Sequence, residues 1–165
     1  MRGAMTPYPL FFTFKELVYG DGFVAECAMQ GRALAVQEEE REWWFNGVEP
    51  GGLAERGETL NDAYFSFRDT LKEILFDISY TAETFEAFEA KVKRFMHDVN
   101  RPHDEDWWLS VEAGRKGELQ APAPNMREHD ADKEAYAYVT LVDPAKVKPS
   151  GNELGGIEYA RRSAA

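Results

Sequence analysis

The sequence contains a single cysteine, Cys27, among its 165 residues. An internal disulfide and a thiolate-rich zinc site are therefore excluded, because both need more than one cysteine. Basic residues are also scarce: 19 Lys and Arg stand against 30 Asp and Glu, and the net charge is −11. This balance argues against a surface that grips nucleic acid, since phosphate contacts need clustered Lys and Arg. It is compatible with a basic protein partner, which an acidic surface attracts and steers.

Long apolar runs are missing as well. No stretch reaches the roughly 20 apolar residues that cross a bilayer, and no apolar signal core follows Met1. We therefore expect no membrane insertion and no export, and we predict a soluble protein with a cytoplasmic location. With 44% hydrophobic and 30% charged residues, the chain can bury a core. Its length suits one domain.

The first fifty residues show the period-two alternation of β-strands. Residues 11–19 are rich in aromatic side chains, and as a strand they place Phe12, Phe14 and Val18 on one face; Gly20-Asp21-Gly22 follows as a turn signal. Residues 23–37 predict the return strand, with a bulge or bend at Gly31-Arg32. Residues 42–48 predict the next strand. Short connections between consecutive strands favour an antiparallel meander.

Two amphipathic helices are predicted next. Thr59 is a suitable N-cap for the first helix, which extends to about Ser79. Apolar residues recur along it at three- and four-residue steps, the spacing of one helix face: Leu60, Ala63, Tyr64, Phe67, Leu71, Ile74, Leu75 and Ile78. The second helix begins near Thr81 or Thr84 and ends before Pro102. Both helices are expected to pack on the sheet, in a domain formed by residues 1–100.

The last third of the chain is less regular. Residues 106–112 and 135–142 each predict a strand, and a polar connection joins them at 120–132. Residues 101–142 are expected to pack on the same domain. Residues 143–165 are poor in apolar side chains, and we expect a flexible tail there. The expected fold class is α+β: an antiparallel sheet packed by two amphipathic helices, with extra C-terminal strands.

No recognised catalytic pattern occurs in the sequence. His97, His103 and the carboxylates around them could hold a metal ion, so a metal-dependent hydrolase is one alternative; a solvated acidic loop is the other. No serine lies on a G-x-S-x-G turn, and the glycine pairs match no phosphate-binding loop. Cys27 falls in a predicted strand, where a small core residue is expected. We therefore expect no enzymatic activity, no bound metal and no cofactor.

The aromatic and acidic residues between 38 and 53 predict a protein-binding surface. Neighbouring side chains on a strand point to opposite faces, so one of Trp43 and Trp44 faces outward unless other strands cover it. An exposed Trp with a charged rim is the expected anatomy of an interface. The predicted partner-binding residues are Glu38, Glu39, Glu40, Glu42, Trp43, Trp44, Asn46, Pro50 and Leu53. The alternative is a solvated hairpin tip, with both Trp residues in the core.

The stretch from Arg32 to Ile78 resembles the HicB family of antitoxins, from bacterial type II toxin–antitoxin modules. The likeness lies in the order of features: an apolar strand, an acidic turn, a Trp-Trp-Phe strand, a Pro-Gly-Gly loop and the helix start at Arg56–Ala63. The resemblance implies a partial ribonuclease-H-like fold without the catalytic acids. It also implies a function, the binding and occlusion of HicA, a small basic RNA-cleaving toxin.

This sequence departs from the family in having an added hairpin at residues 11–29 and no DNA-binding pattern in residues 101–165. We therefore expect no direct binding of nucleic acid. Two functions follow. The first is a HicB-like antitoxin, or a relative, that occludes a basic toxin. The second is a stand-alone interaction module of the same fold that associates with itself and has no toxin partner. We expect a homo-oligomer.

Overall fold

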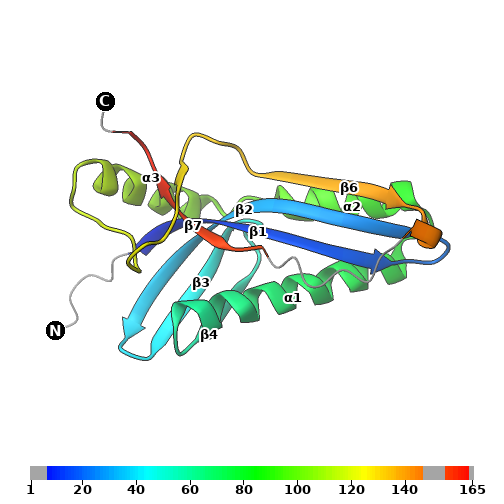
Figure 1. The fold of residues 1–165 in the computed structure, drawn as a ribbon, viewed down its shortest axis with the longest axis horizontal. Coiled ribbons are helices and arrows are strands. Elements are labelled where there is room, and N and C mark those ends of the chain that lie inside the picture. The colour runs from blue at the N-terminus through cyan, green and yellow to red at the C-terminus, as the bar shows by residue number, and fades with distance from the viewer. Residues whose placement is uncertain (1–6, 147–154, 164–165) are drawn as a thin grey trace.

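The structure, a computed structural model, describes residues 7–146 and 155–163. The strands within these residues are β1 (Pro7–Tyr19), β2 (Val24–Glu39), β3 (Glu42–Glu49), β4 (Ala54–Gly57), β5 (Glu128–Asp130), β6 (Tyr136–Val142) and β7 (Ile157–Arg161). The α-helices are α1 (Leu60–Thr81), α2 (Phe85–Met96) and α3 (Arg101–Arg115), and a 3-10 turn spans Pro144–Lys146. The strands form one mostly antiparallel sheet (Figure 1), so the predicted α+β class is confirmed.

β1, β2 and β3 form the predicted antiparallel meander, and β4 extends it, in the spatial order β4-β3-β2-β1. β7 continues the sheet beyond β1, and β5 pairs with β7 in parallel. β2 is long enough to change partner along one edge: residues 24–30 pair with β6, and residues 32–39 pair with β3. The register with β3 shifts between Arg32 and Ala33, next to the bulge or bend predicted at Gly31-Arg32.

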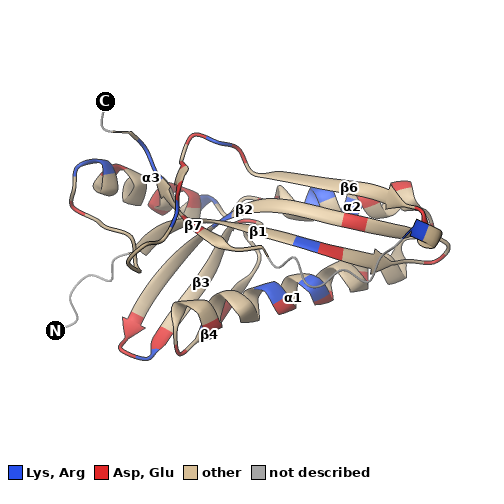
Figure 2. Ribbon diagram, in the orientation of Figure 1, with Lys and Arg blue, Asp and Glu red and all other residues tan. Residues whose placement is uncertain are grey.

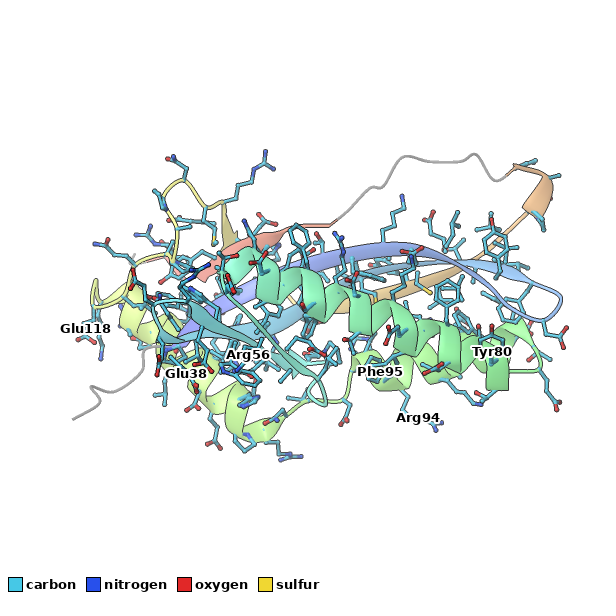
Figure 3. All side chains as sticks on the ribbon, turned by 90° about the horizontal axis from the view of Figure 1, so that it is seen from below. Glu38, Arg56, Tyr80, Arg94, Phe95 and Glu118 are labelled. Carbon is cyan, nitrogen blue, oxygen red and sulfur yellow. The ribbon has the colours of Figure 1, made fainter. Side chains whose placement is uncertain are left out.

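α1 and α2 pack against one face of the sheet, and they lie side by side in Figure 3. Thr59 caps α1 as predicted, since its side-chain oxygen accepts a hydrogen bond from the N–H of Asp62 at 3.0 Å. Thr84 caps α2 in the same way. In the main core beneath α1, the rings of Phe12 and Phe67 lie 5.1 Å apart. Among the described residues, no helix combines the length and apolar character that spanning a membrane requires.

Leu71 tests whether this face of α1 is core. Its side chain is fully buried, so Leu71→Ala should lower the free energy of unfolding by about 2–5 kcal/mol, the cost of a buried cavity. Exposed Glu73, two residues away, supplies the control, because Glu73→Ala should change stability by less than about 0.5 kcal/mol. Urea unfolding followed by circular dichroism measures both values. A loss below about 0.5 kcal/mol for Leu71→Ala would contradict the assigned packing.

The strand predicted at 106–112 is wrong, because these residues belong to α3. Asn100 starts this helix: its side-chain oxygen accepts from the N–H of His103 at 3.1 Å, and Pro102 occupies the first turn. We expected Asn-Arg-Pro to end a helix, yet Asn and Pro also suit a helix start. The buried residues Trp107, Ser110 and Val111 lie on one helical face.

α3 covers the other face of the sheet, at the end away from the β1–β2 hairpin (Figure 1). A second apolar core forms there, from Phe11, Leu34, Val48, Trp107, Val111, Ala131 and Ala160. The expectation of a flexible tail at 143–165 needs correction, since residues 157–161 form β7 beside β1. Their pairing partners lie at residues 10–12 and 128–130, so no local sequence pattern predicts this strand. Residues 147–154 and 164–165 lie outside the described part of the chain.

Candidate functional site

The β2–β3 hairpin carries the acidic part of the predicted partner site. Glu40 and Arg41 form its turn, between the paired residues Glu39 and Glu42. The end of β4 lies beside it and adds Arg56 and Glu58. We call residues 38–42 with residues 56–58 the hairpin tip. Acidic residues colour both strand ends there in Figure 2, and Glu38 and Arg56 lie at the same end of the molecule in Figure 3.

The hairpin tip has an excess of negative charge. Arg41 pairs with Glu58 at 2.7 Å, and Arg56 lies 3.6 Å from Glu42. The hairpin tip contains these two guanidinium groups and five carboxylates, those of Glu38, Glu39, Glu40, Glu42 and Glu58. An open hollow of about 560 Å³ lies between the turn and the end of β4. The tip therefore offers a concave acidic surface with two internal ion pairs.

Trp43 and Trp44 take opposite faces of β3, as strand geometry requires. Trp43 packs at the rim of the main core, where its ring lies 5.9 Å from that of Tyr8. Trp44 belongs to neither of the two apolar cores, and its indole N–H donates to Glu42 at 3.3 Å. Both side chains are half-buried. Trp44 is therefore the member of the pair that faces outward beside the acidic turn.

The structure does not bring the whole predicted site together. Asn46 is half-buried two residues beyond Trp44 on the same face of β3. Pro50 and Leu53 are buried at the opposite end of that strand. Their loop is held by the α2–α3 connection, since the N–H of Gly51 donates to the carbonyl of Asp98 at 2.7 Å. The surface residues near the turn are therefore Glu38, Glu39, Glu40, Glu42 and Trp44.

The histidines considered as metal ligands contact different groups. His97 Nδ1 lies 3.0 Å from a carboxylate oxygen of Glu49, while His103 Nδ1 lies 3.2 Å from the carbonyl oxygen of Gly47. Within residues 7–146 and 155–163, no group of three or more His, Cys, Asp or Glu side chains is placed to hold a metal ion. Burial, together with the nearby carboxylates of Glu16 and Glu26, raises the pKa of the Cys27 thiol to about 12, so little thiolate forms at neutral pH.

A buried ionic network lies under α3. Arg32 is 9% exposed, and its guanidinium donates to Glu49 at 3.0 Å and to Asp104 at 2.7 Å. The same guanidinium lies 4.9 Å from the ring centre of Trp107, a cation–π distance. Glu49 in turn contacts His97. The network thus ties together β2, β3, α3 and the end of α2.

This network was not predicted from the sequence, although one signal was present. Arg32 directly precedes the apolar run of residues 33–36, and a charged side chain in such a run needs a partner once buried. The sequence alone does not identify the partners, which lie 17 and 72 residues away. An open cavity of about 540 Å³ lies beside the network, and Arg32, Glu49, His97 and Trp108 form part of its lining. Arg32 already donates to two carboxylates, so we assign the network a structural role.

Comparison with known proteins returned no match for this chain among protein-family models, curated protein sequences or solved structures.

Proposed function

We propose that this protein binds a basic protein partner at the hairpin tip, in the manner of a HicB-like antitoxin that occludes a small basic RNA-cleaving toxin. The observation that carries the proposal is the position of Trp44, outside both apolar cores and beside an excess of carboxylates. A large aromatic side chain with a charged rim is the arrangement found at the centre of protein interfaces. The acidic chain, with a net charge of −11, would attract such a partner from a distance.

The experiment has two stages. The tagged protein is first purified from its own cells at low salt, and the proteins that accompany it are identified. A small basic protein is the expected companion. The two purified proteins are then mixed, and RNA cleavage by the companion is measured with and without this chain. Cleavage that falls to background at a one-to-one ratio supports the antitoxin function. A companion whose activity is unchanged in the complex would contradict occlusion while leaving protein binding intact.

The carboxylates and Trp44 should contribute to different rate constants. Changing Glu38, Glu39 and Glu40 together to Gln should lower the association rate about tenfold at low salt and flatten its salt dependence. Trp44→Ala should instead speed dissociation and raise Kd about 30-fold, which corresponds to a loss of about 2 kcal/mol of binding free energy. Surface plasmon resonance over a series of salt concentrations measures both effects.

Matched variants show whether these effects are local. Changing the exposed Glu73, Glu83 and Glu86 to Gln removes the same charge away from the hairpin tip, and it should change association much less. Thermal melts come first: Trp44→Ala should remain folded, and Trp43→Ala should lower the melting temperature more, because Trp43 packs on the main core. If the two triple variants associate equally fast, and Trp44→Ala binds as tightly as the unaltered protein, the hairpin tip is not the partner site.

The second function, a self-associating module without a toxin partner, is favoured by a different surface. That surface is the half of the sheet that α3 does not cover.

A further inference from the structure

One half of the sheet carries helices on a single face. α1 and α2 cover that face, while α3 packs at the other end of the sheet against β1, β3 and β7. Residues 13–19 of β1, 24–30 of β2 and 136–142 of β6 form this half, with β2 in the middle. Figure 1 looks onto these strands, with α2 behind them. We call the side of this half opposite α1 and α2 the open face.

Strand pairing identifies the side chains of the open face. Phe14, Cys27 and Val139 point into the main core, so the alternate residues point the other way. Directly paired residues share a face, and the pairs are Lys15 with Ala28, Leu17 with Glu26, and Ala28 with Tyr138. None of these five side chains belongs to either apolar core. Ala28 of β2, the middle strand, therefore lies at the centre of the open face.

Tyrosines dominate the outer part of this face. Tyr138 is 62% exposed and its ring lies 4.8 Å from that of Tyr136. Beside them is an open hollow of about 240 Å³ whose lining includes Thr13, Ala28 and Tyr136. β6 contains no charged residue, as its uniform tan colour in Figure 2 shows. Tyr is enriched at protein interfaces, where charged residues are depleted from the centre.

The charge of the open face suits a second copy of this chain. Two molecules of net charge −11 repel each other, so self-association needs a contact surface without excess negative charge. Of the described residues on this face, the charged ones are Lys15 and Glu26, which lie 3.8 Å apart and have opposite signs. The charges of these described residues cancel, and their arrangement is complementary to itself, as a two-fold symmetric contact requires.

We infer that the open face is a homodimer interface in which two copies pack sheet to sheet about a two-fold axis. An axis that passes between Lys15 and Glu26 sets Lys15 of each copy against Glu26 of the other. The strand register places Ala28 and Tyr138 next to each other near that axis. The small side chain of Ala28 leaves room there, and the paired Tyr138 rings supply the apolar contact.

The size of the face sets the expected affinity. Each of the three segments has seven residues, so the face measures about 23 Å by 14 Å at strand spacing. That is well below the ~800 Å² that each partner contributes to a standard interface. The dimer should accordingly be weak, with a Kd of about 10–100 µM. Sedimentation velocity over a concentration series that brackets this range measures it.

A tyrosine substitution and its control test whether the dimer interface lies on the open face. Tyr138→Glu places two carboxylates near the axis and should weaken dimerisation at least about tenfold. Tyr80 is 88% exposed on α1, on the helix side of the sheet, so Tyr80→Glu adds the same charge away from the face and should leave dimerisation nearly unchanged. Both side chains are largely exposed, so both variants should fold, which circular dichroism checks.

Exchanging the charges of Lys15 and Glu26 tests the two-fold symmetry of the dimer. Lys15→Glu alone and Glu26→Lys alone should each weaken self-association, because like charges then meet across the axis. Mixing the two single variants should restore a dimer, since every cross-axis contact in the mixed dimer again joins opposite charges. Restoration on mixing supports the two-fold arrangement, because a purely structural effect of either substitution would persist.

The result that overturns the inference is a protein that stays monomeric at concentrations about tenfold above the expected Kd. A dimer that survives Tyr138→Glu, or single charge variants that fail to recover on mixing, would also overturn it. The hairpin tip is a separate surface, so the Gln variants of Glu38, Glu39 and Glu40 should dimerise like the unaltered protein. Failure of partner binding and failure of dimerisation can therefore be told apart.

Discussion

Replacing Trp107 with Ala is expected to lower the free energy of unfolding by about 3–5 kcal/mol, as for a large buried aromatic side chain. The indole is fully buried between α3 and the sheet, and its ring lies edge-on to Phe11 at 5.4 Å. Its N–H donates to the carbonyl oxygen of Leu10 at 3.3 Å. Alanine therefore leaves a cavity in the second core and removes a donor from a buried carbonyl.

Two further variants separate these contributions. Trp107→Phe keeps an aromatic ring and loses the N–H, so it should cost less than alanine. Trp108→Ala changes the neighbouring residue, which is half-buried at the rim of the second core, and should also cost less. Denaturant unfolding measures all three. Equal losses for Trp107→Ala and Trp108→Ala would contradict the burial of Trp107, and with it the docking of α3 on this face.

Arg32→Met is the second substitution with a large expected effect, again about 3–5 kcal/mol, the cost of breaking a buried ion pair. The side chain of Glu49 is only 14% exposed, so loss of Arg32 leaves its carboxylate close to apolar surroundings without this donor. Asp104 loses the same partner at the start of α3. Methionine retains much of the side-chain volume, which makes the lost charge the main change.

A double variant distinguishes lost charge from lost packing. Combining Arg32→Met with Glu49→Gln removes the uncompensated negative charge, so it should recover part of the stability that Arg32→Met loses. As a reference, Arg41→Met breaks the exposed pair with Glu58 and should cost no more than about 1 kcal/mol. If Arg32→Met costs as little as Arg41→Met, the network contributes little to holding α3 on the sheet.

The acidic turn of the candidate site was predictable because hairpin tips follow from local sequence. A run of carboxylates between two apolar strands cannot be buried, so residues 38–42 had to lie at the surface. The arginines that partly neutralise the turn were not predictable in the same way. Arg56 reaches Glu42 because β4 folds back beside β3. The loop containing Pro50 and Leu53 was expected at the surface, yet the α2–α3 connection covers it.

The sequence by itself determined the elements whose signals are local. The apolar stripe and Thr59 cap define α1, because both depend on neighbours within one or two turns. The β1–β2 hairpin likewise follows from alternation and a glycine turn. α3 was mistaken for a strand because two adjacent Trp residues satisfy either period over so short a stretch.

Tertiary structure decided the contacts between residues far apart in the chain. β7 pairs with residues 10–12, near the other end of the chain, and only a sheet already formed can offer that edge. Trp44 faces outward because the other face of β3, which carries Trp43 and Phe45, packs on the main core. The open face exists because α3 docks at one end of the sheet, and no helix of the described residues packs on that side of the other end. Such contacts cost loop-closure entropy that only the assembled core offsets, so they are decided by packing and not by local propensity.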